Sequence, residues 1–252
     1  MTTTSNNIFK DVGNITKFGL QFFKEVFKPP YELKEFIKQC FRIGYQSLPL
    51  VAITGFIMGV VMTLQSRPTL AGFGAESWLP GMVGLSLIRE IAPVITALIC
   101  AGNIASGIAA ELGSMKVTEQ IDAMEVSAIN PYKYLAVTRI LATTLMIPIL
   151  VFFADMVGVI GGYIGMNIHS DISFMRYVAK IFESLGFIDV LPATIKSFFF
   201  GFVIGLIGCY KGFTAANGTE SVGKAANSAV VVASLTIFII DMLAVQITDV
   251  FF

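Results

Sequence analysis

The adjacent charges Arg89 and Glu90 interrupt an apolar stretch that runs from about Leu79 past Ala110. A charged side chain at the centre of a membrane helix costs about 2.5–3.5 kcal/mol, whereas one leucine contributes only about 0.3–0.6 kcal/mol of stabilisation. Charges in this position are therefore candidates for ligand binding. Neighbouring residues of a helix point about 100° apart, so each charge needs its own partner, from another helix, water or a ligand head group. A structural polar contact within a helix bundle is the alternative.

Three further charges lie inside other apolar stretches: Asp155, Lys196 and Asp241. Because an unpaired charge in hydrocarbon is costly, either aspartate is expected to pair with Lys196 or to fill a polar gap between helices. We expect a structural role for both aspartates. They belong to no aspartate-based catalytic motif.

Sequence signatures of enzymes and metal sites are absent. There is no H-E-x-x-H or G-x-S-x-G motif, and the single histidine, His169, is expected in a loop. The run from Gly218 to Lys224 resembles a phosphate-binding loop, but Ala225 replaces the hydroxyl residue that holds Mg²⁺. Free thiols are expected at three widely spaced cysteines, Cys40, Cys100 and Cys209. The sequence therefore predicts a non-catalytic chain without cofactor or metal, and any energy source must lie in another chain.

Five apolar segments are long enough to cross a membrane. The chain is 55% hydrophobic and only 13% charged, with a mean hydropathy of +0.78. A helix needs about 20 residues to cross about 30 Å of hydrocarbon. The predicted spans cover about 47–65, 79–110, 140–170, 190–210 and 225–248. The second is too long for one straight span, and its candidate kinks are Pro93, Gly102 and Gly107.

Small residues predict where membrane helices touch. Pairs of glycines four residues apart let helix backbones approach closely. Such pairs occur at Gly55/Gly59, Gly158/Gly162, Gly161/Gly165 and Gly201/Gly205. They indicate packing rather than function.

An amphipathic segment, residues 1–43, precedes the predicted membrane domain, 44–252. Over 8–27, apolar residues from Ile8 to Val26 recur at helical spacing, while Lys10, Lys17 and Lys24 lie on another face. This pattern favours a helix lying in the membrane interface, and Pro29-Pro30 is expected to end it. A second amphipathic stretch follows over 33–42. An ordinary solvated helix face is the alternative for both.

The distribution of Lys and Arg predicts the orientation of the chain. Basic residues crowd the N-terminal segment and the loops after the second and fourth spans, whereas the opposite loops hold only Arg67, Arg176 and Lys180. The positive-inside rule then places the N-terminus in the cytoplasm and the C-terminus outside. The formal net charge of zero offers no electrostatic footprint for nucleic acid.

The loop after the second span carries a predicted short acidic helix at about 117–130. Thr118 is expected to cap its N-terminus, with Glu119 and Asp122 in the first turn, where the helix dipole favours acids. Its apolar side is formed by Ile121, Met124 and Val126, and Asn130-Pro131 ends it. A helix of this kind can dock into a groove of a partner protein, or it is a plain connector.

Two blocks of sequence resemble the MlaE/YrbE permease family. The first includes Leu64-Gln65, Ala75-Glu76-Ser77 and the run from Gly84 through Arg89, Glu90 and Pro93. The second runs from Ala110-Glu111 through Thr118, Gln120 and Glu125 to Asn130-Pro131, and the C-terminal part from Gly208 to Asp241 is also similar. The resemblance covers about 44–252. The chain departs from the family at Asn103, where members often have arginine, so a role for that basic residue is not carried over.

This resemblance implies a permease subunit of an ABC transporter that moves phospholipids or related lipids between membranes. It implies a homodimer in the inner membrane, driven by a pair of cytoplasmic ABC ATPase subunits and served by a periplasmic MCE-domain protein similar to MlaD. The resemblance also allows a small cytoplasmic accessory protein as a further partner.

The same resemblance implies roles for particular residues. The helix at 117–130 becomes the coupling helix on the ATPase, with Glu111, Thr118, Glu119, Asp122 and Glu125 as coupling residues. The lipid cavity is expected at Gln65, Leu70, Phe73, Arg89 and Glu90. Two other functions are open: a proton-coupled secondary transporter, although no clear internal repeat is present, and a membrane scaffold, which would leave Arg89 and Glu90 without a purpose.

Overall fold

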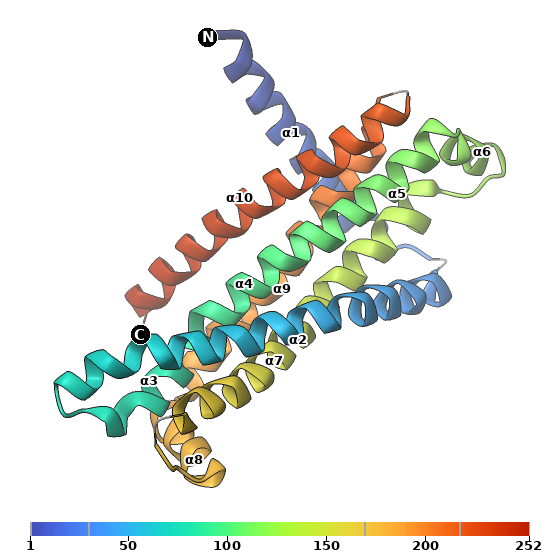
Figure 1. Cartoon of the computed structure of the whole chain (residues 1–252). Helices are drawn as coiled ribbons and strands as arrows, with labels where there is room; N and C mark the ends of the chain where they lie inside the picture. The colour runs from blue at the N-terminus through green and yellow to red at the C-terminus, as the bar shows by residue number, and fades with distance from the viewer. Residues whose placement is uncertain (1, 30, 169, 217, 252) are drawn as a thin grey trace. The chain divides into compact units, whose positions relative to one another are not determined.

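The described part of the chain is mainly helical, and it contains no strand. The computed structural model describes residues 2–29, 31–168, 170–216 and 218–251, with side chains from 11 to 250 inside these ranges; Pro30, His169 and the side chains of Ile8 and Lys10 lie outside it. Figure 1 shows the elements, whose bounds in chain order are α1 (Thr2–Glu25), α2 (Leu33–Gly72), η1 (Glu76–Trp78), α3 (Leu79–Ser86), η2 (Leu87–Ile91), α4 (Ala92–Cys100), η3 (Ala101–Ala105), α5 (Ser106–Val117), α6 (Gln120–Val126), η4 (Tyr132–Val137), α7 (Thr138–Asn167), α8 (Phe174–Ser184), α9 (Phe187–Phe213) and α10 (Thr219–Phe251).

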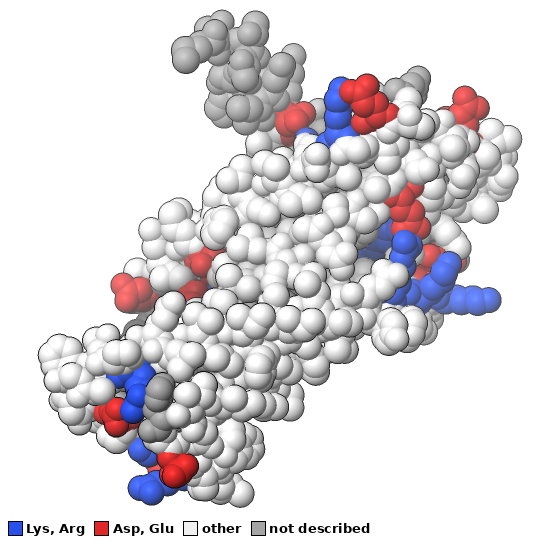
Figure 2. Space-filling view, in the orientation of Figure 1, with Lys and Arg blue, Asp and Glu red and all other residues white. Residues whose placement is uncertain are grey.

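Five helical stretches in the described residues are long and apolar enough to cross a membrane: Leu33–Gly72, Glu76–Val117, Tyr132–Asn167, Phe187–Phe213 and Thr219–Val250. Each exceeds the roughly 20 residues that a span requires. Figure 2 shows that most of the visible surface carries neither basic nor acidic side chains. The predicted all-α membrane fold with five spans is confirmed, and the chain is a multi-pass membrane protein.

The long helices contribute to two compact units, which consist of 1–43, 100–146 and 201–236 in the first and of 44–99, 147–200 and 237–252 in the second. Residues 1–43 thus pack with later parts of the chain. The Tyr132 hydroxyl donates to the Phe18 carbonyl at 2.5 Å, and the two rings lie 4.7 Å apart. Helix α2 continues through the expected boundary at 43/44 without a break. The division into two domains and the interfacial position of α1 stay predictions.

The second span contains two widened, π-helical turns, η2 and η3. Pro93 has no N–H, so the carbonyl of Arg89 loses its usual donor four residues on, and the helix widens just before the proline. The second widened turn contains Gly102, whereas Gly107 lies inside the regular helix α5. Two of the three expected kink positions, Pro93 and Gly102, therefore lie next to or within a π turn. The first of them carries Arg89 and Glu90.

Glycines mediate close helix contacts within each unit. In the second unit, a Cβ on Gly59 of α2 would strike the carbonyl group of Gly158 on α7. In the first unit, a Cβ on Gly201 of α9 would lie 2.5 Å from the carbonyl oxygen of Thr143. The helix backbones touch at these points, as the spacing of the glycines predicts.

Helix α8 was not expected from the sequence, because its 11 residues are too few to cross a membrane. It packs against α3, beside it in Figure 1, where a Cβ on Gly84 would meet Ile181 at 2.7 Å. Tyr177 of α8 is buried in the same core, and burial raises the pKa of its hydroxyl to about 12. The phenol therefore stays neutral at physiological pH.

The glycine contact between α2 and α7 yields a stability prediction. Gly59→Ala is expected to destabilise the protein by about 1–3 kcal/mol, because its methyl group requires a backbone shift. Gly107→Ala is the matched control, since nothing lies within 4 Å of a Cβ there. Thermal unfolding in detergent measures both. A Gly59→Ala protein as stable as the control would contradict the backbone contact.

Candidate functional site

A cluster of charges in the second unit is centred on Lys196 of α9. Its ammonium group donates to Glu90 Oε2 at 2.5 Å and to Asp241 Oδ1 of α10 at 2.9 Å. The Lys196 side chain is only 4% exposed. A buried ammonium group with two carboxylates has its charge compensated, which confirms the expected pairing of Asp241 with Lys196.

Arg89 has a different partner from Glu90, as the helix geometry predicts. Its Nη1 lies 3.7 Å from Asp189 Oδ1 near the start of α9, and its side chain is 43% exposed. This ion pair is too long for a hydrogen bond. The guanidinium has five N–H donors, so it retains donors for another acceptor.

An apolar hollow of about 490 Å³ lies beside the cluster, between α9 and α10. Lys196 and Thr248 supply its polar groups. Its other lining residues are apolar: Leu191, Pro192, Ile195, Phe199, Ile240, Ala244 and Ile247. A smaller neighbouring depression brings Arg89 and Glu90 together with Lys196 and Thr248. An apolar hollow with charge at one side suits an amphipathic ligand.

The other expected lipid-binding residues do not line this hollow. Gln65 is exposed on α2, Phe73 is 82% exposed just beyond its end, and Leu70 packs against the core formed by α3, α7 and α8. A role for these three residues in lipid binding stays a prediction. Of the five expected residues, the structure brings only Arg89 and Glu90 to the charge cluster.

Asp155 of α7 does not take part in the cluster. It is buried, and its Oδ1 has no hydrogen-bond partner among the described residues. A second small depression places Asp155 beside Thr194, Ser197 and apolar side chains. The expectation that either aspartate pairs with Lys196 therefore holds for Asp241.

The short helix expected at 117–130 is observed as α6, which projects beyond the end of α5 (Figure 1). Thr118 does not cap it. The Thr118 hydroxyl donates back to the Ser114 carbonyl at 2.9 Å and ends α5, while Glu119 precedes α6 in a left-handed conformation (φ 58°). That prediction was wrong because α5 continues to Val117, so the threonine satisfies a carbonyl of the preceding helix instead.

The apolar residues of α6 do not share one environment, although the sequence predicts that they form one side of the helix. Ile121 is buried, whereas Val126 is 90% exposed. Asp122 accepts from Lys116 at 2.8 Å, and Glu125 lies on the exposed side. The exposed side chains of the helix therefore include the apolar Val126 and the acidic Asp122 and Glu125.

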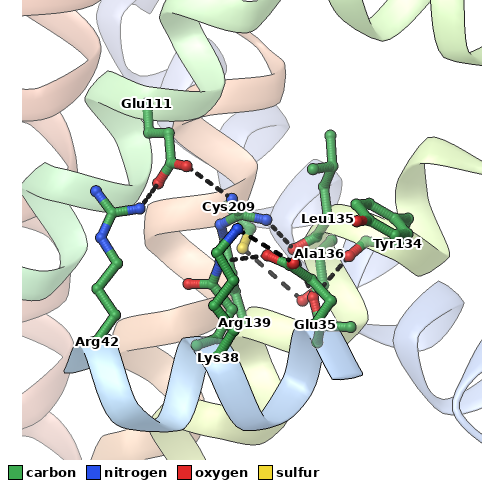
Figure 3. A network of polar contacts seen from close by, with 11 residues as sticks. Glu35, Lys38, Arg42, Glu111, Tyr134, Leu135, Ala136, Arg139 and Cys209 are labelled. Carbon is green, nitrogen blue, oxygen red and sulfur yellow. Dashed lines mark hydrogen bonds and ion pairs between the residues drawn. The ribbon is translucent and has the colours of Figure 1, made fainter. Parts of the chain in front are cut away.

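Glu111 anchors the helix that leads to α6. Its carboxylate accepts from Arg42 of α2 at 2.7 Å and from Arg139 of α7 at 3.0 Å (Figure 3). Arg139 is 2% exposed and also donates to the Leu135 carbonyl at 3.0 Å. Glu111 thus links α5 to α2 and α7 within the first unit, and two arginines fix the position of its carboxylate.

The run that resembles a phosphate-binding loop is mostly helical. Helix α10 begins at Thr219, so Gly223 and Lys224 lie inside it, and Lys224 pairs with Glu220 one turn away. The backbone N–H groups at these positions belong to the helix and do not form a loop that could surround a phosphate. The described residues also contain no group of three metal-ligating side chains.

Comparison with known proteins identifies the family. A sequence model of the family described as Permease MlaE matches residues 36–247. The chain belongs to the MlaE permease family. The match includes the Lys196 cluster, Glu111, α6 and every lining residue of the apolar hollow except Thr248.

Curated proteins from bacteria and a plant are similar to this MlaE-family chain. A probable ABC transporter permease protein of Rickettsia prowazekii is 40% identical over 96% of this chain and 93% of its own length. The intermembrane phospholipid transport system permease protein MlaE of Haemophilus influenzae is 30% identical over 91% and 89%. The chloroplastic protein TRIGALACTOSYLDIACYLGLYCEROL 1 of Arabidopsis thaliana is 33% identical over 81% and 59%.

Sequence reasoning missed two features of the site in this MlaE-family chain. Asp189 lies just before the fourth predicted span, and nothing in its spacing indicates that it pairs with Arg89. Arg139 lies just before the third predicted span, yet it is buried and pairs with Glu111. For both residues, the sequence signal that could have indicated a buried or paired charge is its position at the margin of an apolar stretch.

The cluster predicts the effect of removing its only lysine. Lys196→Ala is expected to destabilise the protein by about 3 kcal/mol, the low end of the range for a broken buried pair, because Asp241 loses its cation while Glu90, 39% exposed, is partly compensated by solvent. Adding Glu90→Gln and Asp241→Asn should restore most of the loss. Unfolding in detergent measures the variants, and Lys224→Ala, with an exposed side chain, is the control expected to change stability by less than about 0.5 kcal/mol. A silent Lys196→Ala would contradict the cluster.

Proposed function

We propose that this chain is the permease subunit of an ABC transporter that moves phospholipids between envelope membranes, driven by a separate ATPase. The observation that carries the proposal is the Lys196 charge cluster beside the apolar hollow of α9 and α10. Membership of the MlaE permease family supports it. The name of the Haemophilus influenzae relative supports phospholipid as the substrate class.

The residues of the cluster have distinct parts in lipid binding. The apolar wall accepts acyl chains by the hydrophobic effect. Lys196 is already compensated by two carboxylates, so it holds α9 and α10 in place. Arg89 is half-exposed and weakly paired, so its guanidinium binds the head-group phosphate, for which arginine is well suited. Glu90 limits the net positive charge at this point.

Cytoplasmic ATPase subunits supply the energy, and α6 is their docking element. The exposed Val126 fits an apolar pocket, and Asp122 and Glu125 fit a basic rim. Glu111 acts as a positioning residue, because it transmits a displacement of α6 to α2 and α7 through two ion pairs. Glu119 shapes the connection through its left-handed backbone.

The remaining assignments follow the family and the charge pattern. The N-terminus faces the cytoplasm of the inner membrane, as the positive-inside rule indicates. Two copies of the chain form the membrane core. A periplasmic MCE-domain protein exchanges lipid with it.

Lipid transfer tests the cluster. With the chain and its ATPase in proteoliposomes, Arg89→Ala should slow ATP-dependent phospholipid transfer by about tenfold or more, the effect of one lost charge-assisted hydrogen bond. Arg67→Ala is the matched control, because Arg67 pairs with Glu76 outside the hollow. Wild-type transfer by both Arg89→Ala and Glu90→Ala would refute the lipid site. Transfer that follows a proton gradient without ATPase would indicate a secondary transporter.

Copurification tests the docking element. The tagged chain from its native membrane should retain a cytoplasmic ATPase, and Val126→Asp should weaken that association by about tenfold or more, as expected when an interface anchor is lost. Combined Asp122→Asn and Glu125→Gln should act in the same direction. The control is Glu220→Gln, an exposed change at the start of α10. An ATPase retained equally by all variants would refute docking through α6.

A further inference from the structure

A second hollow, of about 180 Å³, lies in the first unit between the end of α1, the start of α2 and the η4–α7 segment. It shares no lining residue with the Lys196 hollow. Polar groups, among them Tyr31, Glu32 and Lys133, stand with the apolar side chains of Phe36, Leu141 and Leu145. We propose that this hollow binds a zwitterionic phospholipid with a primary amine in its head group. The proposal rests on the membrane position of the chain and not on transport.

The apolar wall matches one acyl chain in direction and length. Val137, Leu141 and Leu145 are spaced four residues apart, so they line one face of the helix. From Val137 to Leu145 the helix rises about 12 Å, close to the depth of one leaflet, which is half of about 30 Å. Phe36 of α2 closes the other side of the wall. Leu145 is 45% exposed, so the chain of a lipid can continue beyond the hollow.

The polar end of the hollow is formed by Lys133 and Tyr31, and Lys133 lies one helical turn before Val137. The Lys133 ammonium donates to the Lys28 carbonyl and stands 6.0 Å from the centre of the Tyr31 ring. Of its three N–H donors, the contact with Lys28 uses one, which leaves donors for a phosphate. Tyrosine and lysine at a helix end are typical of the level of lipid head groups.

The charges around the hollow favour a zwitterion over an anionic lipid. Lys28 and Lys133 are balanced by Glu25 and Glu32, and Glu25 already pairs with Lys28 at 2.7 Å. Glu32 is partly buried, and no ion pair reaches it among the residues that the structure describes. A lipid that carries both a phosphate and a primary ammonium group satisfies Lys133 and Glu32 together, because its N–H groups donate to the carboxylate, whereas the quaternary ammonium of phosphatidylcholine has no N–H. An anionic head group satisfies only Lys133, and an apolar protein helix satisfies neither.

Photo-crosslinking tests the proposal on the full chain in nanodiscs of phosphatidylcholine. Diazirine analogues of phosphatidylethanolamine and phosphatidylglycerol are added separately, and labelled peptides are identified by mass spectrometry. The ethanolamine analogue should label peptides that contain 31–36 and 133–145 about tenfold more than the glycerol analogue, the effect of one additional charged hydrogen bond.

Variants separate a specific site from general contact with lipid. Lys133→Ala should lower labelling by the ethanolamine analogue about tenfold, and Glu32→Gln should remove the preference between analogues. Leu145→Trp should lower labelling by filling the hollow, while Ile149→Trp, one turn farther on and also exposed, should not. Lys224→Ala is the control for loss of a lysine.

Two results would overturn the proposal. Equal labelling by both analogues, unchanged in Lys133→Ala and Leu145→Trp, would show that the surface contacts bulk lipid only. A photoreactive residue at position 145 that crosslinks another polypeptide in the native membrane would show that a protein segment fills the hollow. Neither result depends on lipid transfer, so failure here is distinct from failure of the transporter proposal.

Discussion

The free energy of a charge in hydrocarbon governs where the polar residues of this chain lie. Lys196 is held between Glu90 and Asp241, and Arg139 is held by Glu111 and a backbone carbonyl. Because the partners come from different helices, each ion pair also fixes the rotation of one helix against another. Removing one partner leaves an uncompensated buried charge, which is why these contacts support both the fold and the site.

Close approach of the helices depends on small residues. In lipid, no hydrophobic effect drives helices together, so van der Waals contact between backbones matters more than in water. Gly59 and Gly201 provide that contact, one in each unit. Proline then adjusts the spans locally. The widened turn before Pro93 sets the direction of Arg89 and Glu90, and π turns are frequent at functional sites.

The two hollows combine charge with apolar walls in different ways. Lys196 is fully compensated, and the half-exposed Arg89 is the group available to a phosphate. At the second hollow, Lys133 and Glu32 form a neutral rim that suits a zwitterion. In the proposed function, the first hollow receives the transported lipid. The second suits a lipid retained among α1, α2 and α7.

The sequence by itself determined the membrane fold, its five spans and the charges inside those spans, because hydropathy and the cost of a charge act locally along the chain. The roles of Asp189 and Arg139, at the margins of the spans, came from the structure. It also predicted that Arg89 and Glu90 have separate partners and that α6 exists. The tertiary structure decided which residues meet. Glu90 meets Lys196, Arg89 meets Asp189, and Gln65, Leu70 and Phe73 lie away from the hollow.

Thr118 also shows that local sequence does not settle which groups pair. Because α5 extends to Val117, the Thr118 hydroxyl donates to the Ser114 carbonyl and does not cap α6. Periodicity gives the face on which a residue lies, but pairing depends on the rotation and register of each helix against its neighbours. These follow from glycine contacts and proline-induced turns distributed over the whole chain. Spacing within one segment carries no information about them.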